Sequence, residues 1–355
     1  MAKIINYIGL MAGTSLDGVD AVIVDSACKK ILASHFLPYP KELKNQLKNL
    51  AKNSQTNLKT IAELDITVAR IFAKAANQLL QRAKIDAKNI QAIGSHGQTI
   101  YHQGGNYSWQ IGHGALISEL TGITTVADFR MPDIAAGGQG APLTPKYHQY
   151  LLAGKDGVFV NLGGIANITI VKNSTVCGFD TGPANTLLDN WIAAKKQLDY
   201  DENGLWAGRG SVDDVLLKAL LADDYFAQNP PKSTGTEYFN LRWLEAYLTA
   251  EQSDIAVQRT LLELSAVSIS SHIPTGSDVY LCGGGVHNLL LVERLKSQNP
   301  NSKITTTAAL NADPDFVEAA AFAYFAQQTL AAKPSNLPEV TGAKSTRILG
   351  AIYAK

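Results

Sequence analysis

The stretch IGLMAGTSLDGVDAVIVD, residues 8–25, decides the fold of this chain. An apolar run over Ile4–Leu10 predicts a β-strand, and a second apolar run over Val19–Asp25 predicts another strand directly after it. The segment GTSLDG, residues 13–18, joins the two runs. Backbone N–H groups of glycine-containing turns can bind phosphate. The stretch therefore predicts a β-hairpin whose turn binds an anion without the lysine of a Walker A motif.

Two later segments repeat parts of this plan. The segment GVFVNLGGIANITIV, residues 157–171, again predicts a strand, a polar glycine-containing turn and a strand. The segment DVYLCGGGVHN, residues 278–288, predicts a strand that ends in three glycines before a helix, but it lacks the last small residue of a GxGxxG fingerprint. Each turn alone is more often a tight turn than a ligand site. Their order, two hairpin turns and then a strand–GGG–helix element, is similar to that of the actin, sugar kinase and Hsp70 superfamily.

Length and composition indicate a globular protein of about two domains. The 355 residues are 46% hydrophobic and 17% charged, and Lys+Arg and Asp+Glu both number 31. The balanced charge and the lack of a basic stripe argue against a nucleic-acid partner. No uninterrupted apolar stretch reaches the ~20 residues of a membrane span, and the N-terminal segment is too weakly apolar for a signal peptide. With three scattered cysteines, these features predict a cytoplasmic protein without a disulfide framework or a zinc site.

Predicted strands and helices alternate along the chain, which favours an α/β fold. Helical spacing of apolar residues predicts a long helix over 61–83, and an alanine-rich helix is expected over 315–332. The Gly/Pro-rich segment 130–145 shows no periodicity and is expected to be a loop at a domain crossing. We therefore expect domain I to span 1–135, with a returning segment of about 335–355, and domain II to span 136–334.

A set of longer motifs carries a more specific resemblance. In order, these motifs are GLMAGTSLDGVD, GSHGQT, TVADFRMPDIAAGGQGAPLTP, NLGGIANIT, GFDTGPANTLLDNW, PPKSTGTEYFN, CGGGVHN and LGAIYAK. From residue 8 to the C-terminus the chain resembles the anhydro-N-acetylmuramic acid kinase family. Ala184 and Thr236 stand where the family more often has glycine and arginine.

The resemblance implies a fold and an activity. The expected fold is the two-domain, actin-like ATPase fold with an active-site cleft between the domains. The expected enzyme uses water to open the 1,6-anhydro ring of anhydro-N-acetylmuramic acid and phosphorylates O6 from ATP with Mg²⁺, giving N-acetylmuramic acid 6-phosphate for peptidoglycan recycling. The resemblance also implies a homodimer.

Asp180 in GFDTGPAN is the expected general base. It lies where a predicted strand ends and a predicted helix begins, a place from which side chains reach into α/β sites. The alternative interpretation is a helix cap or turn carboxylate.

The resemblance also implies roles for the glycine-rich turns. The residues expected to bind phosphate or nucleotide are Gly13, Thr14, Ser15, Asp17, Gly18, Asn161, Gly163, Gly164, Gly283, Gly284, Gly285 and Asn288. Asp17 is also expected to hold Mg²⁺, directly or through water, although an Asp-Gly turn has an equally ordinary structural use.

Five further residues are expected to bind the sugar: Arg130, His96, Asp133, Asn185 and Glu318. The planar guanidinium of Arg130 suits the lactyl carboxylate or sugar hydroxyls, but it could instead form a structural ion pair. A single histidine such as His96 is commonly a structural residue.

Two other functions remain open from the sequence. The chain could phosphorylate another amino sugar, or it could be an inactive sugar-sensing member of the superfamily. The retention of Asp180 and of all three glycine-rich turns argues against the inactive alternative.

Overall fold

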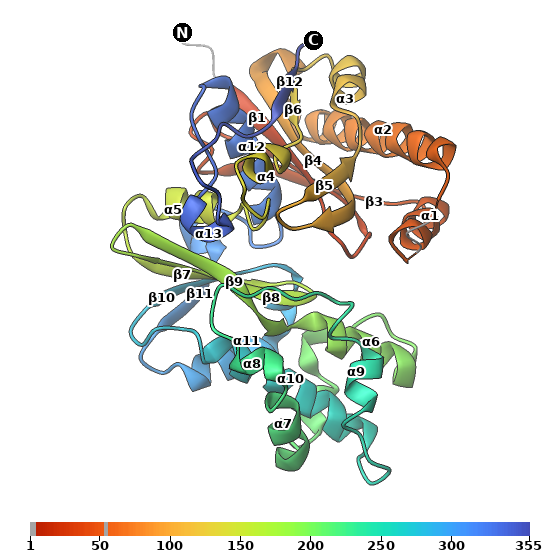
Figure 1. Cartoon of the computed structure of the whole chain (residues 1–355), viewed down its shortest axis with the longest axis vertical. Coiled ribbons are helices and arrows are strands. Elements are labelled where there is room, and N and C mark those ends of the chain that lie inside the picture. Colours follow the sequence, from red (N-terminus) through yellow and green to blue (C-terminus); the bar gives the residue numbers. More distant parts are fainter. Residues whose placement is uncertain (1–4, 53–55) are drawn as a thin grey trace. The chain divides into compact units, whose positions relative to one another are not determined.

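The computed structural model describes residues 5–52 and 56–355, and this part of the chain divides into two compact units (Figure 1). The first unit contains the chain up to Leu151 together with Leu310–Lys355, and the second is Leu152–Ala309. The boundaries expected after residues 135 and 334 differ from this division. Helix α12 (Val317–Leu330) and nearly all of α5 (Pro145–Leu152) belong to the first unit, because they pack with its residues.

The sheet of the first unit is built outward from the opening hairpin. The strand order is β12 (Ala351–Tyr353), β6 (Thr125–Ala127), β4 (Ile90–Gln103), β1 (Asn6–Ala12), β2 (Gly18–Val24) and β3 (Ile31–Pro38), and β5 (Tyr107–Ile111) pairs with β4. β1 runs antiparallel to β2 and parallel to β4. The predicted hairpin is thus confirmed, while Ile4, where its first strand was expected to begin, lies outside the described residues.

Helices cover both faces of this sheet. Ile8 and Leu10 of β1 share a buried core with α2 (Leu58–Ala83), which confirms the long helix predicted there. Gly9, between them, faces α12, because a Cβ at this position would lie only 1.8 Å from the carbonyl oxygen of Ala319. Close packing of α12 on the sheet therefore requires glycine at this position. Other helices of this unit are α1 (Lys41–Lys52), α3 (Gly114–Thr121) and α13 (Pro338–Thr341).

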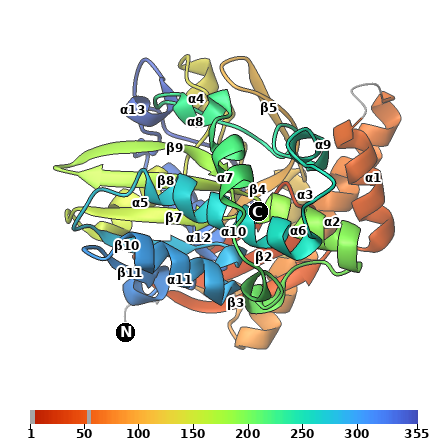
Figure 2. The same cartoon turned by 90° about the horizontal axis from the view of Figure 1, so that it is seen from below.

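The second unit has a sheet of its own with helices on one face (Figures 1 and 2). The strand order is β11 (Lys303–Thr306), β10 (Asp278–Cys282), β7 (Gly157–Leu162), β8 (Ile165–Lys172) and β9 (Thr175–Pro183). The core joins Val158 and Leu281 of the sheet to Leu261 and Leu264 of α10 (Asp254–Ser270). The remaining helices are α6 (Asn185–Lys196), α7 (Asp214–Leu221), α8 (Asp224–Ala227), α9 (Leu241–Glu245) and α11 (Leu289–Gln298).

The expectation of a loop over residues 130–145 was wrong in part. A short helix, α4 (Met131–Ala135), lies within it, and α5 begins at Pro145. Pro132 occupies the first turn of α4, where its missing N–H is not needed. Five residues are too few to show a helical period, so the sequence pattern could not reveal this helix.

The predicted α/β architecture, with one sheet in each of two units, is confirmed. The interdomain cleft implied by the resemblance stays a prediction. No helix among residues 5–52 and 56–355 combines the length and apolar character needed to cross a membrane.

Candidate functional site

The turn of the opening hairpin is held by hydrogen bonds at Gly13 and is exposed at its tip. The carbonyl of Gly13 accepts a hydrogen bond from Nε2 of Gln98 at 3.2 Å, and Oε1 of Gln98 accepts one from the hydroxyl of Tyr39 at 3.1 Å. Thr14 and Ser15 are exposed at the tip. The backbone is thus held in place while both residues at the tip are exposed, which suits a turn that binds phosphate.

Asp17 and Gly18 have surroundings of different kinds. Asp17 is exposed, and its Oδ1 lies 2.5 Å from Nζ of Lys44. Gly18 is buried in β2 opposite Pro38, and a Cβ there would lie 2.3 Å from the carbonyl oxygen of Leu37. Gly18 thus allows β2 and β3 to pack closely, and Lys44 already neutralises the Asp17 carboxylate.

Asp20 was not predicted from the sequence. It lies in β2, where burial raises its pKa to about 7, and the nearby carboxylates of Glu318, Asp315 and Asp17 add to the increase. The signal that could have identified it is an acidic residue inside the otherwise apolar strand GVDAVIV. A group of carboxylates that disfavour one another's charge is an environment that a cation would stabilise.

Buried His96 pairs with partly buried Arg130. Nε of Arg130 donates to Nε2 of His96 at 3.0 Å, and Nδ1 of His96 lies 2.9 Å from the carbonyl oxygen of Gly97. Because arginine has no acceptor, Nε2 must accept, and the proton of the neutral ring is on Nδ1. Burial, with the Arg130 charge, lowers the pKa of His96 well below its usual value, so the ring stays neutral. Burial also lowers the pKa of Arg130 to about 10, although Glu318 opposes the effect.

Glu318 lies in the first turn of α12, and its carboxylate interacts with Arg130. Burial raises the pKa of Glu318, and the charge of Arg130 opposes this increase. Arg130, His96 and Glu318, all predicted from the sequence, therefore share one polar environment in the first unit.

Asp133 has a structural environment. Its side chain is fully buried, and Oδ1 accepts hydrogen bonds from Nδ2 of Asn336 and Oγ1 of Thr341, both at 2.7 Å. Oδ2 accepts from the Gly140 N–H at 2.9 Å, and the Gly140 carbonyl in turn accepts from Nη1 of Arg130 at 2.8 Å. Direct sugar binding by Asp133 would require a carboxylate oxygen that can reach the sugar. Both oxygens of this buried carboxylate instead accept hydrogen bonds from the protein.

In the second unit, the turn between β7 and β8 contacts the beginning of α6. The carbonyl of Gly163 accepts from the Asn185 N–H, and that of Gly164 accepts from the Thr186 N–H, both at 3.0 Å. Nδ2 of Asn185 donates to the carbonyl of Leu162 at 2.9 Å. The predicted phosphate turn and the predicted sugar ligand Asn185 therefore lie together.

The GGG segment packs against the same turn. A Cβ at Gly283 would lie 2.2 Å from Oδ1 of Asn161, and one at Gly285 would lie 3.0 Å from Oδ1 of Asn185. Gly283 also has a φ of +81°, which favours glycine. A Cβ at Gly284, in contrast, would meet nothing within 4 Å. The close packing explains two of the three glycines, and the space beside the third is open to a ligand.

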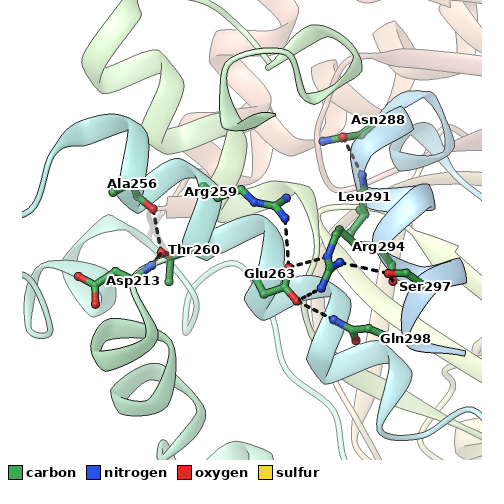
Figure 3. Close-up of polar contacts among 10 residues, drawn as sticks. All are labelled: Asp213, Ala256, Arg259, Thr260, Glu263, Asn288, Leu291, Arg294, Ser297 and Gln298. Atoms are coloured by element: carbon green, nitrogen blue, oxygen red, sulfur yellow. Dashed lines mark hydrogen bonds and ion pairs between the residues drawn. The ribbon is translucent and has the colours of Figure 1, made fainter. Parts of the chain in front are cut away.

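Asn288 caps the helix that follows. Its Oδ1 accepts a hydrogen bond from the Leu291 N–H at 3.1 Å at the beginning of α11 (Figure 3). Its oxygen therefore has a structural role beside the predicted nucleotide contact.

Asp180 lies near the end of β9, opposite Asn167 of β8. Its Oδ2 accepts a hydrogen bond from the Thr234 N–H at 3.0 Å. Burial raises the pKa of Asp180 to about 6; the Thr234 N–H opposes the increase and the Glu237 carboxylate adds to it. Such a carboxyl is a stronger base than an exposed one and is still ionised at neutral pH. Thr234 and Glu237 were missed because only the fold brings their segment to β9.

The strand ends explain why these groups meet. β7 and β10 are parallel, and β8 is antiparallel to both β7 and β9. The carboxyl ends of β7, β9 and β10 therefore lie at one edge of the sheet, which is where ligands bind in α/β folds.

Among the described residues, no group of three or more His, Cys, Asp or Glu side chains could hold a metal ion. Mg²⁺ in phosphoryl-transfer enzymes needs less than this, because waters and substrate phosphates complete its coordination around one or two carboxylates. Asp20, with its unfavourable neighbouring negative charges, fits such a role better than Asp17, which pairs with Lys44.

Comparison with known proteins finds relatives along nearly the whole chain. Residues 5–355 match the family model described as anhydro-N-acetylmuramic acid kinase. Relatives named anhydro-N-acetylmuramic acid kinase include one from Coxiella burnetii (strain Dugway 5J108-111), 47% identical over 98% of this chain and 97% of the relative. Another, from Pseudomonas fluorescens (strain Pf0-1), is 44% identical over 98% of this chain and 99% of the relative.

A solved structure shares the fold at low sequence identity. Component A of the (R)-2-hydroxyglutaryl-CoA dehydratase of Acidaminococcus fermentans superposes with a TM-score of 0.50 at 11% identity, over 92% of this chain and 99% of that one. The match along nearly the whole sequence and the identity to these relatives lead to one conclusion: this chain belongs to the anhydro-N-acetylmuramic acid kinase family.

Proposed function

We propose that this protein is an ATP-dependent kinase that opens the 1,6-anhydro ring of anhydro-N-acetylmuramic acid with water and phosphorylates the released O6. The observation that carries the proposal is Asp180, a partly buried carboxylate at the carboxyl end of β9 whose pKa is raised to about 6. Family membership gives the kinase class. A base of this strength is what activation of water requires.

In the proposed reaction, Asp180 accepts a proton from a water molecule as the water oxygen bonds to the anomeric carbon. The bond between that carbon and O6 breaks, and its electron pair stays on O6. O6 then bonds to the γ-phosphorus of ATP, the bond to the β,γ-bridging oxygen breaks, and ADP leaves. Asp180 releases its proton to solvent afterwards. The protein supplies a base and fixed positions and needs no covalent intermediate.

The phosphates of ATP are the proposed ligands of the two hairpin turns. Thr14 and Ser15 supply exposed hydroxyl groups from the first unit, and Gly163 and Gly164 supply backbone from the second. The open space at Gly284 suits the nucleoside. Mg²⁺, when bound beside Asp20, would neutralise phosphate charge.

Sugar recognition is assigned to Arg130 and Glu318 in the first unit and to Asn185 in the second. Arg130 has Nε and Nη1 fixed by His96 and Gly140. His96 and Asp133 thus hold the guanidinium in place, so that its remaining N–H groups can meet a carboxylate or hydroxyl. We assign Asp133 a supporting role in place of a direct contact.

The test offers the purified protein ATP and Mg²⁺ with either anhydro-N-acetylmuramic acid or N-acetylmuramic acid. The expected product from the anhydro sugar is heavier than its substrate by one phosphoryl group and one water, as read by mass spectrometry. Phosphorylation of N-acetylmuramic acid alone would refute ring opening and favour a kinase for an ordinary amino sugar. The cytoplasmic location, the role in peptidoglycan recycling and the homodimer stay proposals, and light scattering of the purified protein tests the last of these.

A further inference from the structure

One segment outside the sheet holds Asp180 at three atoms. The hydroxyl of Tyr225 donates to the Asp180 carbonyl oxygen at 2.7 Å, and the Asp180 N–H donates to the Lys232 carbonyl at 3.1 Å. The Thr234 N–H donates to the carboxylate at 3.0 Å. Just beside this point the register between β8 and β9 shifts, between Ala166 and Asn167. The segment therefore fixes both the main chain and the carboxylate of Asp180 where the strand pairing is irregular.

Tyr225 is itself held on several sides. Tyr225 is 4% exposed, and its ring packs edge-on against the ring of Phe239, with the ring centroids 5.4 Å apart. Nζ of Lys232 lies 4.8 Å from the ring centroid and 3.4 Å from the Tyr225 carbonyl oxygen. The Tyr225 N–H donates to Oδ1 of Asp223 at 2.9 Å. With so many contacts the ring has little freedom, and its hydroxyl is directed to one acceptor.

Several aromatic side chains donate hydrogen bonds to Asp223. Its carboxylate accepts hydrogen bonds from the hydroxyl of Tyr238 at 2.9 Å, from Nε1 of Trp243 at 2.8 Å and from the hydroxyl of Tyr247 at 3.2 Å. Burial favours the neutral form of Asp223, but these bonds outweigh it and keep the pKa of Asp223 below its usual value. We call Asp223, Tyr225, Tyr238, Trp243 and Tyr247 the Asp223 aromatic cluster.

Hydrophobic packing alone does not explain this arrangement. A phenylalanine would fill the volume of the Tyr225 ring, yet the hydroxyl is present and reaches the Asp180 carbonyl. The partly buried carboxylate of Asp223 would also lose part of its hydration at a cost without the donors that converge on it. The polar atoms therefore connect the cluster to Asp180 by hydrogen bonds.

We propose that the Asp223 aromatic cluster is a positioning device for Asp180, in which Tyr225 is the positioning residue that acts directly on the strand end. The proposal rests on the role of Asp180 as the base in the proposed function. Asp223 fixes the main chain of Tyr225, the Tyr225 hydroxyl fixes the Asp180 peptide, and the carboxylate is then aligned with the Thr234 N–H.

Loss of the Tyr225 hydroxyl has a defined consequence for the pH profile. The Asp180 peptide would lose one anchor, and the bond from Thr234 would lengthen. That N–H lowers the pKa of Asp180, so its weakening raises the pKa further. The pH below which kcat falls, because the base is protonated, is therefore higher in the variant. The other charged or titratable groups around this strand end are Glu237, Lys232 and His272.

The experiment compares Tyr225→Phe with Tyr280→Phe, a matched control in β10 of the same unit. The Tyr280 ring packs on Phe159, and its hydroxyl has no hydrogen-bond partner among the described residues. Both variants are assayed with the anhydro sugar and ATP–Mg²⁺ from about pH 5 to pH 9, with thermal unfolding and KM for ATP as structural readouts. For Tyr225→Phe we expect kcat to fall by about 10- to 100-fold, with the acid limb at higher pH and KM for ATP unchanged. Tyr280→Phe should match the wild type.

A second variant, Asp223→Asn, covers the case in which Tyr225→Phe does not fold. It keeps the size of the side chain but weakens the bonds that hold Tyr225, so the acid limb should move in the same direction by a smaller amount. A folded Tyr225→Phe or Asp223→Asn enzyme with the wild-type kcat and pH profile overturns the proposal. If Asp180→Asn is inactive while those variants behave like the wild type, only the positioning proposal is refuted and the proposed function is retained. Full activity of Asp180→Asn would refute the proposed function itself.

Discussion

Replacement of Glu263 by alanine should strongly destabilise the second unit. Glu263 lies at the centre of a polar network between α10 and α11 (Figure 3). Its Oε1 accepts from Nη2 of Arg294 at 2.8 Å and from Nε2 of Gln298 at 2.7 Å, and its Oε2 accepts from Nε of Arg294 at 2.9 Å. Nη2 of Arg259 lies 3.6 Å from Oε2. The substitution removes the anion that joins two guanidinium groups.

The burial of these groups sets the magnitude. The side chains of Arg259 and Glu263 are 14% and 8% exposed, whereas that of Arg294 is 32% exposed. Within the described part of the chain, nothing accepts a hydrogen bond from the buried Nη1 of Arg259. Removing one partner of a buried ion pair costs about 3–5 kcal/mol, and the partial exposure of Arg294 favours the lower end, about 3 kcal/mol. At roughly 2–4 °C for each kcal/mol, the expected decrease in Tm is about 6–12 °C.

Thermal unfolding followed by circular dichroism at neutral pH measures the effect. The matched control is Glu245→Ala on α9, where the glutamate is exposed and the expected change is within about 0.5 kcal/mol. The Tm of Glu263→Gln should lie between those of the two alanine variants, because glutamine keeps the volume and a hydrogen-bond acceptor but loses the charge. A Tm for Glu263→Ala equal to that of the control would refute the claim that this network joins α10 to α11.

Two further predictions concern the site. Asp133→Ala should lower the free energy of unfolding by about 3 kcal/mol, because it leaves the buried donors of Asn336, Thr341 and Gly140 unsatisfied. It should also raise KM for the sugar, because Gly140 helps to hold Arg130. Urea denaturation and steady-state kinetics measure the two effects, and an unchanged urea midpoint would contradict the structural role. For the wild-type enzyme, kcat should decrease as the pH falls through about 6, because protonation of Asp180 removes the base; a pH–rate profile that is flat well below this value would show that another group acts.

The hairpins and the GGG segment could be predicted because their signals are local. Alternating apolar residues, a short polar turn and consecutive glycines all lie within about twenty residues of sequence. The requirement for glycine at 283 and 285 follows from close packing that the fold then shows. Local signals also placed Asp180 near the end of a strand that precedes a helix, as in the structure, while its role as a base stays a proposal.

The partners of these residues could not be predicted in the same way. The family resemblance gave Asp133 as a sugar-binding candidate, but its partners Asn336 and Thr341 are more than 200 residues away. Tyr225 and Thr234 reach Asp180 only through the folded path of their segment. Such contacts depend on tertiary structure, which periodicity and turn chemistry do not determine.

The two units of the structure differ from the expected domain boundaries for a related reason. The Gly/Pro-rich segment 130–145 indicates a break in regular structure, but which unit a helix joins depends on the face it buries. α12 buries Ala319 and Phe322 against β1 and β4, and this places it in the first unit.

The central claim is that Asp180 is the base for water in a ring-opening phosphoryl transfer. The direct measurement is product formation from anhydro-N-acetylmuramic acid and ATP–Mg²⁺ by wild-type protein and by Asp180→Asn, with ATP binding measured separately by calorimetry. The wild type should give the phosphorylated, hydrated sugar, and Asp180→Asn should give none while it binds ATP with nearly unchanged affinity. Product formation by Asp180→Asn at close to the wild-type rate would contradict the account.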